Sequence, residues 1–171
     1  MGTIILKIKF HIFAIIKILL YKLLYRGAFQ IGKETTFRKN FSLYLERGAK
    51  IEIGRDCFFN NGCSLNVLKK IKIGDGCIFG ENVKIYDHNH RFADSDKKIK
   101  EQGYSVSELN IGKHCWFGSN VVILKGANIG DNCVIGAGCI ISGKIESNTL
   151  VKPKQDYIME EIRRVHNGVL K

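Results

Sequence analysis

The sequence predicts an all-β protein built as a parallel β-solenoid, and three observations support this fold class. The first is a period of six in residues 111–146, which divide into IGKHCW, FGSNVV, ILKGAN, IGDNCV, IGAGCI and ISGKIE. The second is the chemistry of that period, because each block opens with Ile or Phe and its fourth place is mostly Gly, Asn or His. The third is a composition with 18 glycines and one proline, which suits repeated strands and turns better than a helix bundle.

Each six-residue block reads as a short strand followed by a sharp turn. In CWFG (115–118) and CVIG (133–136) alternate residues are apolar, as in a strand with one buried face. The other two residues must turn the chain, and Gly or Asn at the second of them tolerates the positive φ that this turn needs. Three blocks complete a coil of 18 residues around a triangular prism, and each coil pairs only with its neighbours.

Residues 1–28 are expected to form a helix ahead of the solenoid. No acidic residue occurs before Glu34, and basic residues recur through the segment. Its longest stretch without a basic side chain, residues 10–16 with His11 taken as neutral, is far shorter than the about 20 apolar residues of a membrane span. Two compatible interpretations remain: the helix lies in a membrane interface, or it caps the open end of the solenoid.

The solenoid is expected over residues 29–152, with an inserted loop at 91–110. The repeat begins loosely at Ile31, tightens at Ile53 and stops after His90. It resumes in phase at Ile111, and an insertion of this length on a compact scaffold is more often functional than accidental. Glycines that follow the first residue of a block are interpreted as outward positions where a ligand or a neighbouring chain approaches the backbone.

Residues 153–171 are expected to form a tail that leaves the solenoid. Pro153 stops the repeat, and the apolar spacing over residues 156–165 predicts a short amphipathic helix.

Composition and cysteine placement bound the function. A chain of 171 residues with 45% hydrophobic residues allows one continuous core. The net charge of +11 comes without a groove-entering motif or an aromatic stacking platform, so a membrane surface or a phosphorylated cofactor explains it better than nucleic acid. All six cysteines fall at the fifth place of a block, which predicts buried, reduced, structural thiols and a cytosolic compartment. They are Cys57, Cys63, Cys77, Cys115, Cys133 and Cys139.

The repeat register separates one histidine from the other four. His88 and His114 occupy the fourth place, where a turn accounts for them, and His11 and His166 lie in the expected terminal helices. His90 occupies an outward sixth place at the start of the inserted loop, where neither a turn nor the core requires histidine. It is therefore the candidate general base, since imidazole exchanges a proton near neutral pH.

Two segments resemble the hexapeptide-repeat acyltransferase family. VKIYDHNHRF is similar to the segment of maltose, galactoside and xenobiotic O-acetyltransferases that ends in their catalytic histidine, before an acceptor loop. CWFGSNVVILKGANIGDNCVIGAGCII resembles their coenzyme A-binding coils, and the resemblance extends over residues 51–152. It implies a left-handed parallel β-helix of hexapeptide repeats and acyl transfer, with acetyl-CoA as donor and no metal.

The resemblance also implies roles for individual residues. His90 would take a proton from an acceptor hydroxyl, and a backbone N–H near Gly118 or Ser119, or the Asn60 amide, would stabilise the oxyanion. The candidate substrate-binding residues are Asn60, Asp87, His88 and Trp116. The candidate cofactor-binding residues are Trp116, Gly118, Ser119, Ala137, Ser142, Lys144, Lys152 and Lys154, with Arg164 as a further phosphate contact. The family commonly has threonine-lysine where this chain has Ser142-Gly143.

These expectations combine into one function and one assembly. The function is acetyl-CoA-dependent O-acetylation of a sugar hydroxyl, in surface-polysaccharide or glycolipid assembly at the inner face of the plasma membrane. His90 and Trp116 fall at different corners of the prism, so a shared site requires two chains, as in a homotrimer with inter-subunit sites. Three alternatives remain open: an N-acyltransferase acting on an amino sugar, a carbonic-anhydrase-like metalloenzyme using His88, His90 and His114, and a non-enzymatic scaffold.

Overall fold

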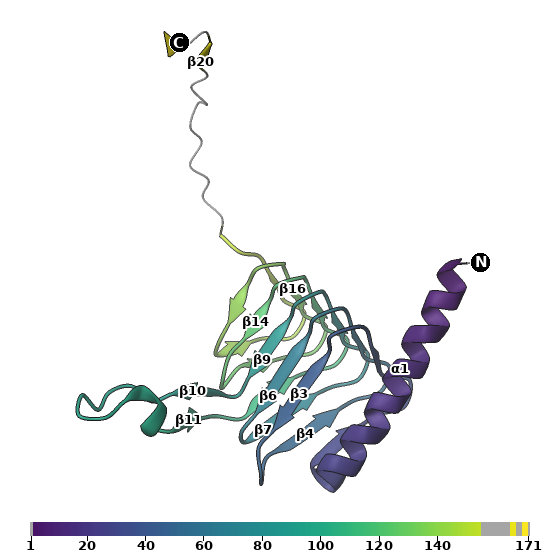
Figure 1. Ribbon diagram of the computed structural model, residues 1–171, viewed down its shortest axis with the longest axis horizontal. Helices are drawn as coiled ribbons and strands as arrows, with labels where there is room; N and C mark the ends of the chain where they lie inside the picture. The colour runs from purple at the N-terminus through teal and green to yellow at the C-terminus, as the bar shows by residue number, and fades with distance from the viewer. Residues whose placement is uncertain (1, 155–164, 167–168, 171) are drawn as a thin grey trace.

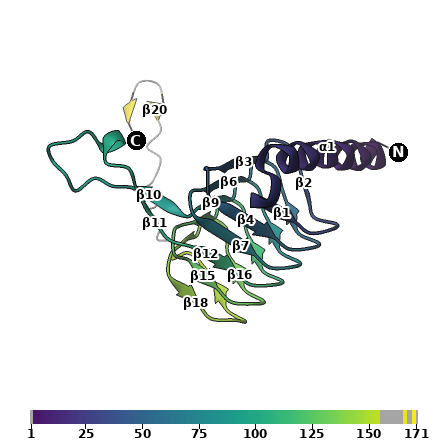
Figure 2. The same ribbon diagram turned by 90° about the horizontal axis from the view of Figure 1, so that it is seen from below.

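The computed structural model describes residues 2–154, 165–166 and 169–170, and its main body is a parallel β-helix (Figure 1). Helix α1 (Gly2–Tyr25) and the 3₁₀ turn η1 (Arg26–Ala28) precede the solenoid. A hairpin extends away from one corner of the prism (Figures 1 and 2). The predicted solenoid of hexapeptide repeats with an N-terminal helix is confirmed.

Three parallel sheets form the walls of the prism, and we call them A, B and C. Sheet A contains β1 (Phe29–Ile31), β4 (Lys50–Ile53), β7 (Lys70–Ile73), β12 (Leu109–Ile111), β15 (Asn128–Ile129) and β18 (Lys144–Ile145). Sheet B contains β2 (Thr36–Phe37), β5 (Phe58–Phe59), β8 (Ile78–Phe79), β13 (Trp116–Phe117), β16 (Val134–Ile135) and β19 (Leu150–Val151). Sheet C contains β3 (Ser42–Leu45), β6 (Ser64–Val67), β9 (Lys84–Tyr86), β14 (Val122–Ile123) and β17 (Ile140–Ile141).

The strand register confirms the 18-residue coil in the regular part of the repeat. Ile111 pairs with Ile129, and Ile123 pairs with Ile141, in each case 18 residues apart. The first coils are longer, since Phe37 pairs with Phe59, 22 residues on. The extra residues lie in the early blocks, where the sequence repeat is also loose.

First-place residues stack on one another along the interior. The rings of Phe59, Phe79 and Phe117 are parallel, with centroids 4.4 and 4.8 Å apart, and all three are fully buried. Each buried ring contributes about 2–3 kcal/mol of hydrophobic stabilisation. Isoleucine fills the equivalent places of sheet A, and leucine or isoleucine those of sheet C.

The six cysteines are free and buried, as predicted. Five of their thiols also donate a weak hydrogen bond to the carbonyl of a residue one coil further along. These contacts are Cys57 to Gly74, Cys63 to Gly80, Cys77 to Gly112, Cys115 to Gly130 and Cys133 to Glu146, with Sγ–O distances of 3.1–3.2 Å. Burial raises the pKa of the Cys63 thiol to about 11, so this thiol stays protonated at neutral pH.

The prediction for the turn residues at the fourth place is confirmed, whereas the prediction for the glycines at the second place is wrong. The fourth place is left-handed as expected, with φ of 55° at His114 and 57° at Asn132. The second-place glycines, however, do not leave room for an approaching ligand. A Cβ on Gly118 would lie 2.5 Å from the backbone nitrogen of Ala137, one coil further along. These glycines are required because neighbouring coils stack closely there.

Helix α1 covers the N-terminal end of the solenoid, as the capping interpretation predicted. The Tyr21 ring packs edge-on against Phe29 and Phe41, at 5.7 and 6.4 Å between centroids. Its hydroxyl accepts a hydrogen bond from the Leu43 N–H at 3.3 Å. The Lys17 amino group donates to the Phe41 carbonyl. No helix in the described part of the chain has both the length and the apolarity of a bilayer crossing.

The short helix predicted over residues 156–165 lies outside the described residues, apart from Val165. Val165 and His166 form strand β20 (Val165–His166), which pairs antiparallel with β21 (Val169–Leu170).

Candidate active site

The chain leaves the solenoid at Asp87, three residues earlier than the sequence indicated. Strand β10 (His88–His90) runs antiparallel to β11 (Tyr104–Val106), and the loop between them contains the 3₁₀ turn η2 (Ile99–Glu101). The prediction that His88 occupies a left-handed turn is therefore wrong. His88 pairs with Val106 as the first residue of the hairpin strand.

Asp87 anchors the hairpin to the preceding coil. Its side chain is fully buried, and its two carboxylate oxygens accept hydrogen bonds from the N–H groups of Leu68 and Lys69 at 2.8 and 2.7 Å. One of these oxygens also lies 3.2 Å from the His88 Nδ1. The Asp87 carbonyl accepts from the Ser107 N–H at 2.9 Å, so both ends of the insertion meet at this residue. A buried carboxylate is tolerated because these donors satisfy it.

His90 is exposed and lies beside Tyr104, the residue with which it is paired in the hairpin. The ring centroids are 4.5 Å apart with a 45° angle between planes. His90 also lines an open cavity of about 480 Å³ together with Arg91, Phe92 and Lys97. A base at the edge of such a cavity can meet an acceptor hydroxyl that enters it.

The inserted loop is braced from within by Gln102. Its amide nitrogen donates to the carbonyls of Asp94 and Lys97 at 2.8 and 2.9 Å, and its amide oxygen accepts from the Asp94 N–H at 3.0 Å. The Arg91 N–H donates to the Gly103 carbonyl at 3.0 Å, which continues the hairpin beyond His90. The cavity wall is therefore a structured segment, although the sequence predicted only a polar, aperiodic loop.

A second group of predicted residues lies on sheet B and at the corner between sheets B and C, which we call the BC corner. Trp116 is 55% exposed and is flanked on the sheet by Ile78 and Val134. Gly118 follows at the corner, but its N–H donates to the Ile135 carbonyl at 2.7 Å. Gly118 is therefore not an available oxyanion donor.

The Ser119 N–H, in contrast, has no acceptor among the described residues. In four other turns, the N–H of the third-place residue donates to the side chain of the third-place residue one coil further along. These pairs are Arg55 to Asp75, Glu81 to Ser119, Lys113 to Asp131 and Asp131 to Ser147, at 2.7–3.2 Å. Ala137 occupies the acceptor place for Ser119 and has no oxygen or nitrogen to offer. The BC corner thus presents a backbone donor beside Trp116.

Asn60 and the remaining cofactor candidates divide between two corners. Asn60 lies at the BC corner, and its side-chain oxygen accepts from the Asn61 N–H at 2.9 Å. Ala137, Lys152 and Lys154 follow the same corner toward the end of the solenoid. Ser142 and Lys144 lie at the corner between sheets C and A, the CA corner, and the Lys144 amino group pairs with Glu146 at 2.7 Å. Arg164 lies outside the described residues.

His90 and Trp116 are thus on separate sides of one chain. The hairpin of His90 leaves from the CA corner, whereas Trp116 belongs to sheet B. Trp116 is followed directly by the BC corner, and the BC and CA corners are the opposite edges of sheet C. A single chain therefore holds the two residues apart, on opposite sides of the prism.

The three histidines that a carbonic-anhydrase-like site would need do not converge. His114 occupies a turn between sheets A and B, whereas His88 and His90 are on the hairpin. Among the described residues, no group of three His, Cys, Asp or Glu side chains is close enough to hold a metal ion. The metalloenzyme alternative has no support in this geometry.

The repeat is also recognisable by comparison with known proteins. Residues 109–142 match the family described as the hexapeptide repeat of succinyl-transferase. The chain belongs to the hexapeptide-repeat acyltransferase family. Among family members, the galactoside O-acetyltransferase of Escherichia coli (strain K12) is 33% identical over 70% of this chain and 58% of its own length. The putative lipopolysaccharide biosynthesis O-acetyl transferase WbbJ of the same strain is 30% identical over 55% of each chain.

A solved structure of a family member contains the acyl donor. The hexapeptide-repeat acetyltransferase VCA0836 of Vibrio cholerae, complexed with acetyl coenzyme A, matches with a TM-score of 0.63 and 25% identity. The match covers 75% of this chain and 68% of that chain. The chain spans somewhat more than half the length of the two curated relatives above.

Proposed function

We propose that this chain is an acetyl-CoA-dependent O-acetyltransferase that modifies a sugar hydroxyl during surface-polysaccharide or glycolipid assembly. The observation that carries the proposal is His90, an exposed imidazole at the edge of an open cavity, on a hairpin anchored by a buried carboxylate. The names of the relatives, a galactoside O-acetyltransferase and a lipopolysaccharide O-acetyl transferase, support the acceptor class. The proposed location is cytoplasmic, with peripheral contact at the inner face of the plasma membrane through residues 1–26.

The reaction needs a base, an oxyanion donor and a leaving thiolate. His90 takes the proton of the acceptor hydroxyl as its oxygen attacks the thioester carbonyl. The Ser119 N–H is the candidate donor to the resulting oxyanion, because it is a backbone donor with no acceptor in the described part of the chain. The tetrahedral intermediate collapses when the C–S bond breaks, and the His90 imidazolium returns its proton to the leaving sulfur. The products are an acetyl ester and free coenzyme A.

The donor, acetyl-CoA, fits the chemistry of the BC corner. Trp116 offers an exposed ring, and Ser119 and Ala137 continue along the same corner. Lys152 and Lys154 follow at the BC corner one coil further along, and Lys144 lies at the CA corner. The ammonium groups of these lysines can meet the phosphates of the cofactor.

The proposed assembly is a homotrimer in which His90 of one chain and Trp116 of the next face one substrate. Its support is the separation of the two residues within a single chain, described above. A heterologous interface that closes into a ring supplies three equivalent sites.

The decisive experiment combines an acceptor screen with one substitution. Release of coenzyme A from acetyl-CoA is measured against sugars, nucleotide sugars, amino sugars and lipid-linked glycans. His90→Ala should lower turnover on the best acceptor about 10²- to 10⁴-fold, while acetyl-CoA binding measured by calorimetry is retained. His114→Asn, which replaces a turn histidine with a residue that suits its φ of 55°, is the matched control.

Turnover by His90→Ala within a few-fold of the unmodified protein would refute the base assignment. A screen in which only amino sugars react would replace O-acetylation with N-acetylation.

A further inference from the structure

Helix α1 is apolar on both of its faces. Toward the solenoid, Ala14 and Tyr21 are buried. On the opposite side Ile12, Leu19 and Leu23 are 54%, 61% and 74% exposed, and their spacing places them along one stripe of the helix. Among the helix residues whose side chains are described, 10–25, the exposed large apolar residues are Ile12, Phe13, Ile15, Ile16, Leu19, Leu20, Leu23 and Leu24. A helix with apolar residues on both faces is ordinarily covered on both, so the exposed outer face indicates a binding surface.

The charged residues of the helix itself are all basic. Residues 1–33 contain six basic residues and no acidic one. Lys17 and Lys22 occupy the sides of the helix between its buried and exposed faces. Their charge complements an anionic surface, whereas a second copy of α1 placed against the first would bring like charges together.

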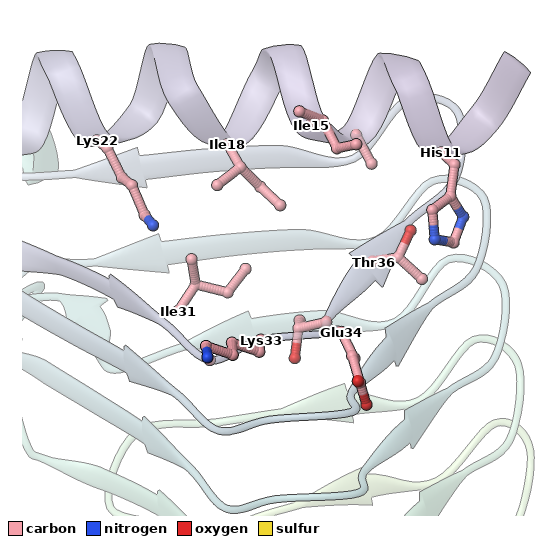
Figure 3. Close-up of a pocket in the computed structure, with 11 residues that line it drawn as sticks. His11, Ile15, Ile18, Lys22, Ile31, Lys33, Glu34 and Thr36 are labelled. Carbon is pink, nitrogen blue, oxygen red and sulfur yellow. The ribbon is translucent and has the colours of Figure 1, made fainter. Parts of the chain in front are cut away.

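A groove lies between α1 and the first coil, beside the outer face. Its volume is about 310 Å³, and Ile15, Ile18 and Ile31 form apolar walls. Figure 3 shows Lys22 reaching from the helix toward the coil, and Lys33 from the coil at the same end of the groove. His11 and Glu34 lie toward the other end (Figure 3). Ile15 lines the groove and is also 53% exposed, so the groove is continuous with the outer face.

We propose that α1 is a docking site for a bilayer rich in anionic phospholipid. The inference deepens the membrane contact of the proposed function and rests on it. One face of α1 is held against the solenoid, so only the opposite face can meet lipid, and the helix lies in the plane of the interface. Ile12, Leu19 and Leu23 enter the boundary between headgroups and acyl chains. In the groove, Lys22 and Lys33 bind the phosphate of one lipid.

Vesicle co-sedimentation of the full chain tests this docking site. The vesicles are phosphatidylcholine alone, or an equimolar mixture of phosphatidylcholine and phosphatidylglycerol. We expect binding to the mixed vesicles that is at least about tenfold stronger than to phosphatidylcholine and that weakens as salt is added. Lys22→Ala and Lys33→Ala should each lower the affinity for mixed vesicles roughly fivefold.

A second pair of variants separates the apolar face from general surface effects. The double variant Leu19→Glu/Leu23→Glu should lose binding to both kinds of vesicle. The matched control is Ile140→Glu on β17, which changes an aliphatic side chain that is 70% exposed on the solenoid and should bind vesicles unchanged. Unaltered thermal unfolding of the double variant would show that α1 remains folded on the first coil.

Three results would overturn the proposal. The first is that the unmodified chain fails to bind mixed vesicles. The second is that the double variant binds them as well as the unmodified chain does. The third is that the double variant has a lower oligomeric mass without lipid, while neither protein binds vesicles. The last result would assign the face to a second copy of the chain. Because vesicle binding is read without acetyl transfer, a chain that binds vesicles but lacks transferase activity refutes the proposed reaction alone.

Discussion

The Tyr104 ring lies 4.5 Å from the His90 imidazole, and the antiparallel register of the hairpin places the two residues directly opposite each other. Tyr104 also meets His88 edge-on at 5.3 Å between centroids. One aromatic side chain therefore contacts both imidazoles of the DHNH segment. Its position is set by backbone pairing, and so it can hold the orientation of His90 toward the cavity.

Replacement of Tyr104 should affect turnover more than donor binding. We expect Tyr104→Ala to lower kcat about tenfold with little change in the KM for acetyl-CoA, because the imidazole loses one wall of its site. Tyr104→Phe should retain most of the activity, since it keeps the ring. Tyr44→Ala, at a side chain that is 51% exposed on sheet C, is the control. Equal loss in Tyr104→Phe and Tyr104→Ala would instead assign the role to the hydroxyl.

Removal of the Asp87 carboxylate should destabilise the base of the hairpin. Asp87→Ala leaves the half-buried N–H groups of Leu68 and Lys69 without their acceptor, which costs about 1–3 kcal/mol in the free energy of unfolding. Asp87→Asn keeps one acceptor oxygen and should cost less. Chemical denaturation measures both, with Asp96→Ala in the exposed loop as control. A loss below about 0.5 kcal/mol for Asp87→Ala would contradict the anchoring role.

Gly74→Ala should destabilise the solenoid, because its Cβ would lie 2.7 Å from the carbonyl group of Gly112. Backbone cannot move away as a flexible side chain can, so we expect a cost of about 1–3 kcal/mol. Gly27→Ala, where a Cβ would meet nothing within 4 Å, is the matched control. Equal denaturation midpoints for the two variants would show that the coils separate freely.

The repeat register predicted which residues face inward because a six-residue block assigns each side chain to a wall, a turn or the core. It located the buried thiols and the left-handed turn at His114 for that reason. It misread the second-place glycines, since a missing side chain looks the same whether a ligand or the next coil approaches. The decisive neighbour of Gly118 is Ala137, and only the stacking of coils brings the two together.

The hairpin could not be predicted from the six-residue period. Residues 88–106 contain no repeat, and the partner of His90 is fixed by a pairing across 14 residues. The hydrogen-bond donors to the Asp87 carboxylate are the N–H groups of Leu68 and Lys69. They belong to the previous coil, so no local sequence pattern reveals them. The Ser119 N–H, which no described residue accepts, did leave a trace in the sequence. The third place holds Asp or Ser one coil beyond Arg55, Glu81 and Lys113, but alanine beyond Ser119.

Ala137→Ser should therefore impair transfer without unfolding the chain. Residue 137 is related to Ser119 as Ser147 is related to Asp131, and the Ser147 hydroxyl accepts a hydrogen bond from the Asp131 N–H at 3.0 Å. A serine hydroxyl at residue 137 would therefore accept a hydrogen bond from the Ser119 N–H. Loss of one oxyanion donor lowers kcat about 10²- to 10³-fold, while the added hydrogen bond stabilises the fold by about 1 kcal/mol. Steady-state kinetics and thermal unfolding measure the two effects. Full activity with a raised unfolding temperature would remove Ser119 from the mechanism.

The proposed trimer predicts that two inactive chains can restore each other. His90→Ala and Trp116→Ala each remove one half of every site in a uniform assembly. In a co-expressed mixture, a site that takes its histidine from one variant and its tryptophan from the other is complete. Random association into closed rings should then recover roughly a quarter of the activity of the unmodified protein. The mass in solution should be three times the 19.3 kDa of one chain. If each site belonged to a single chain, the mixture would stay inactive, because no chain in it carries both His90 and Trp116.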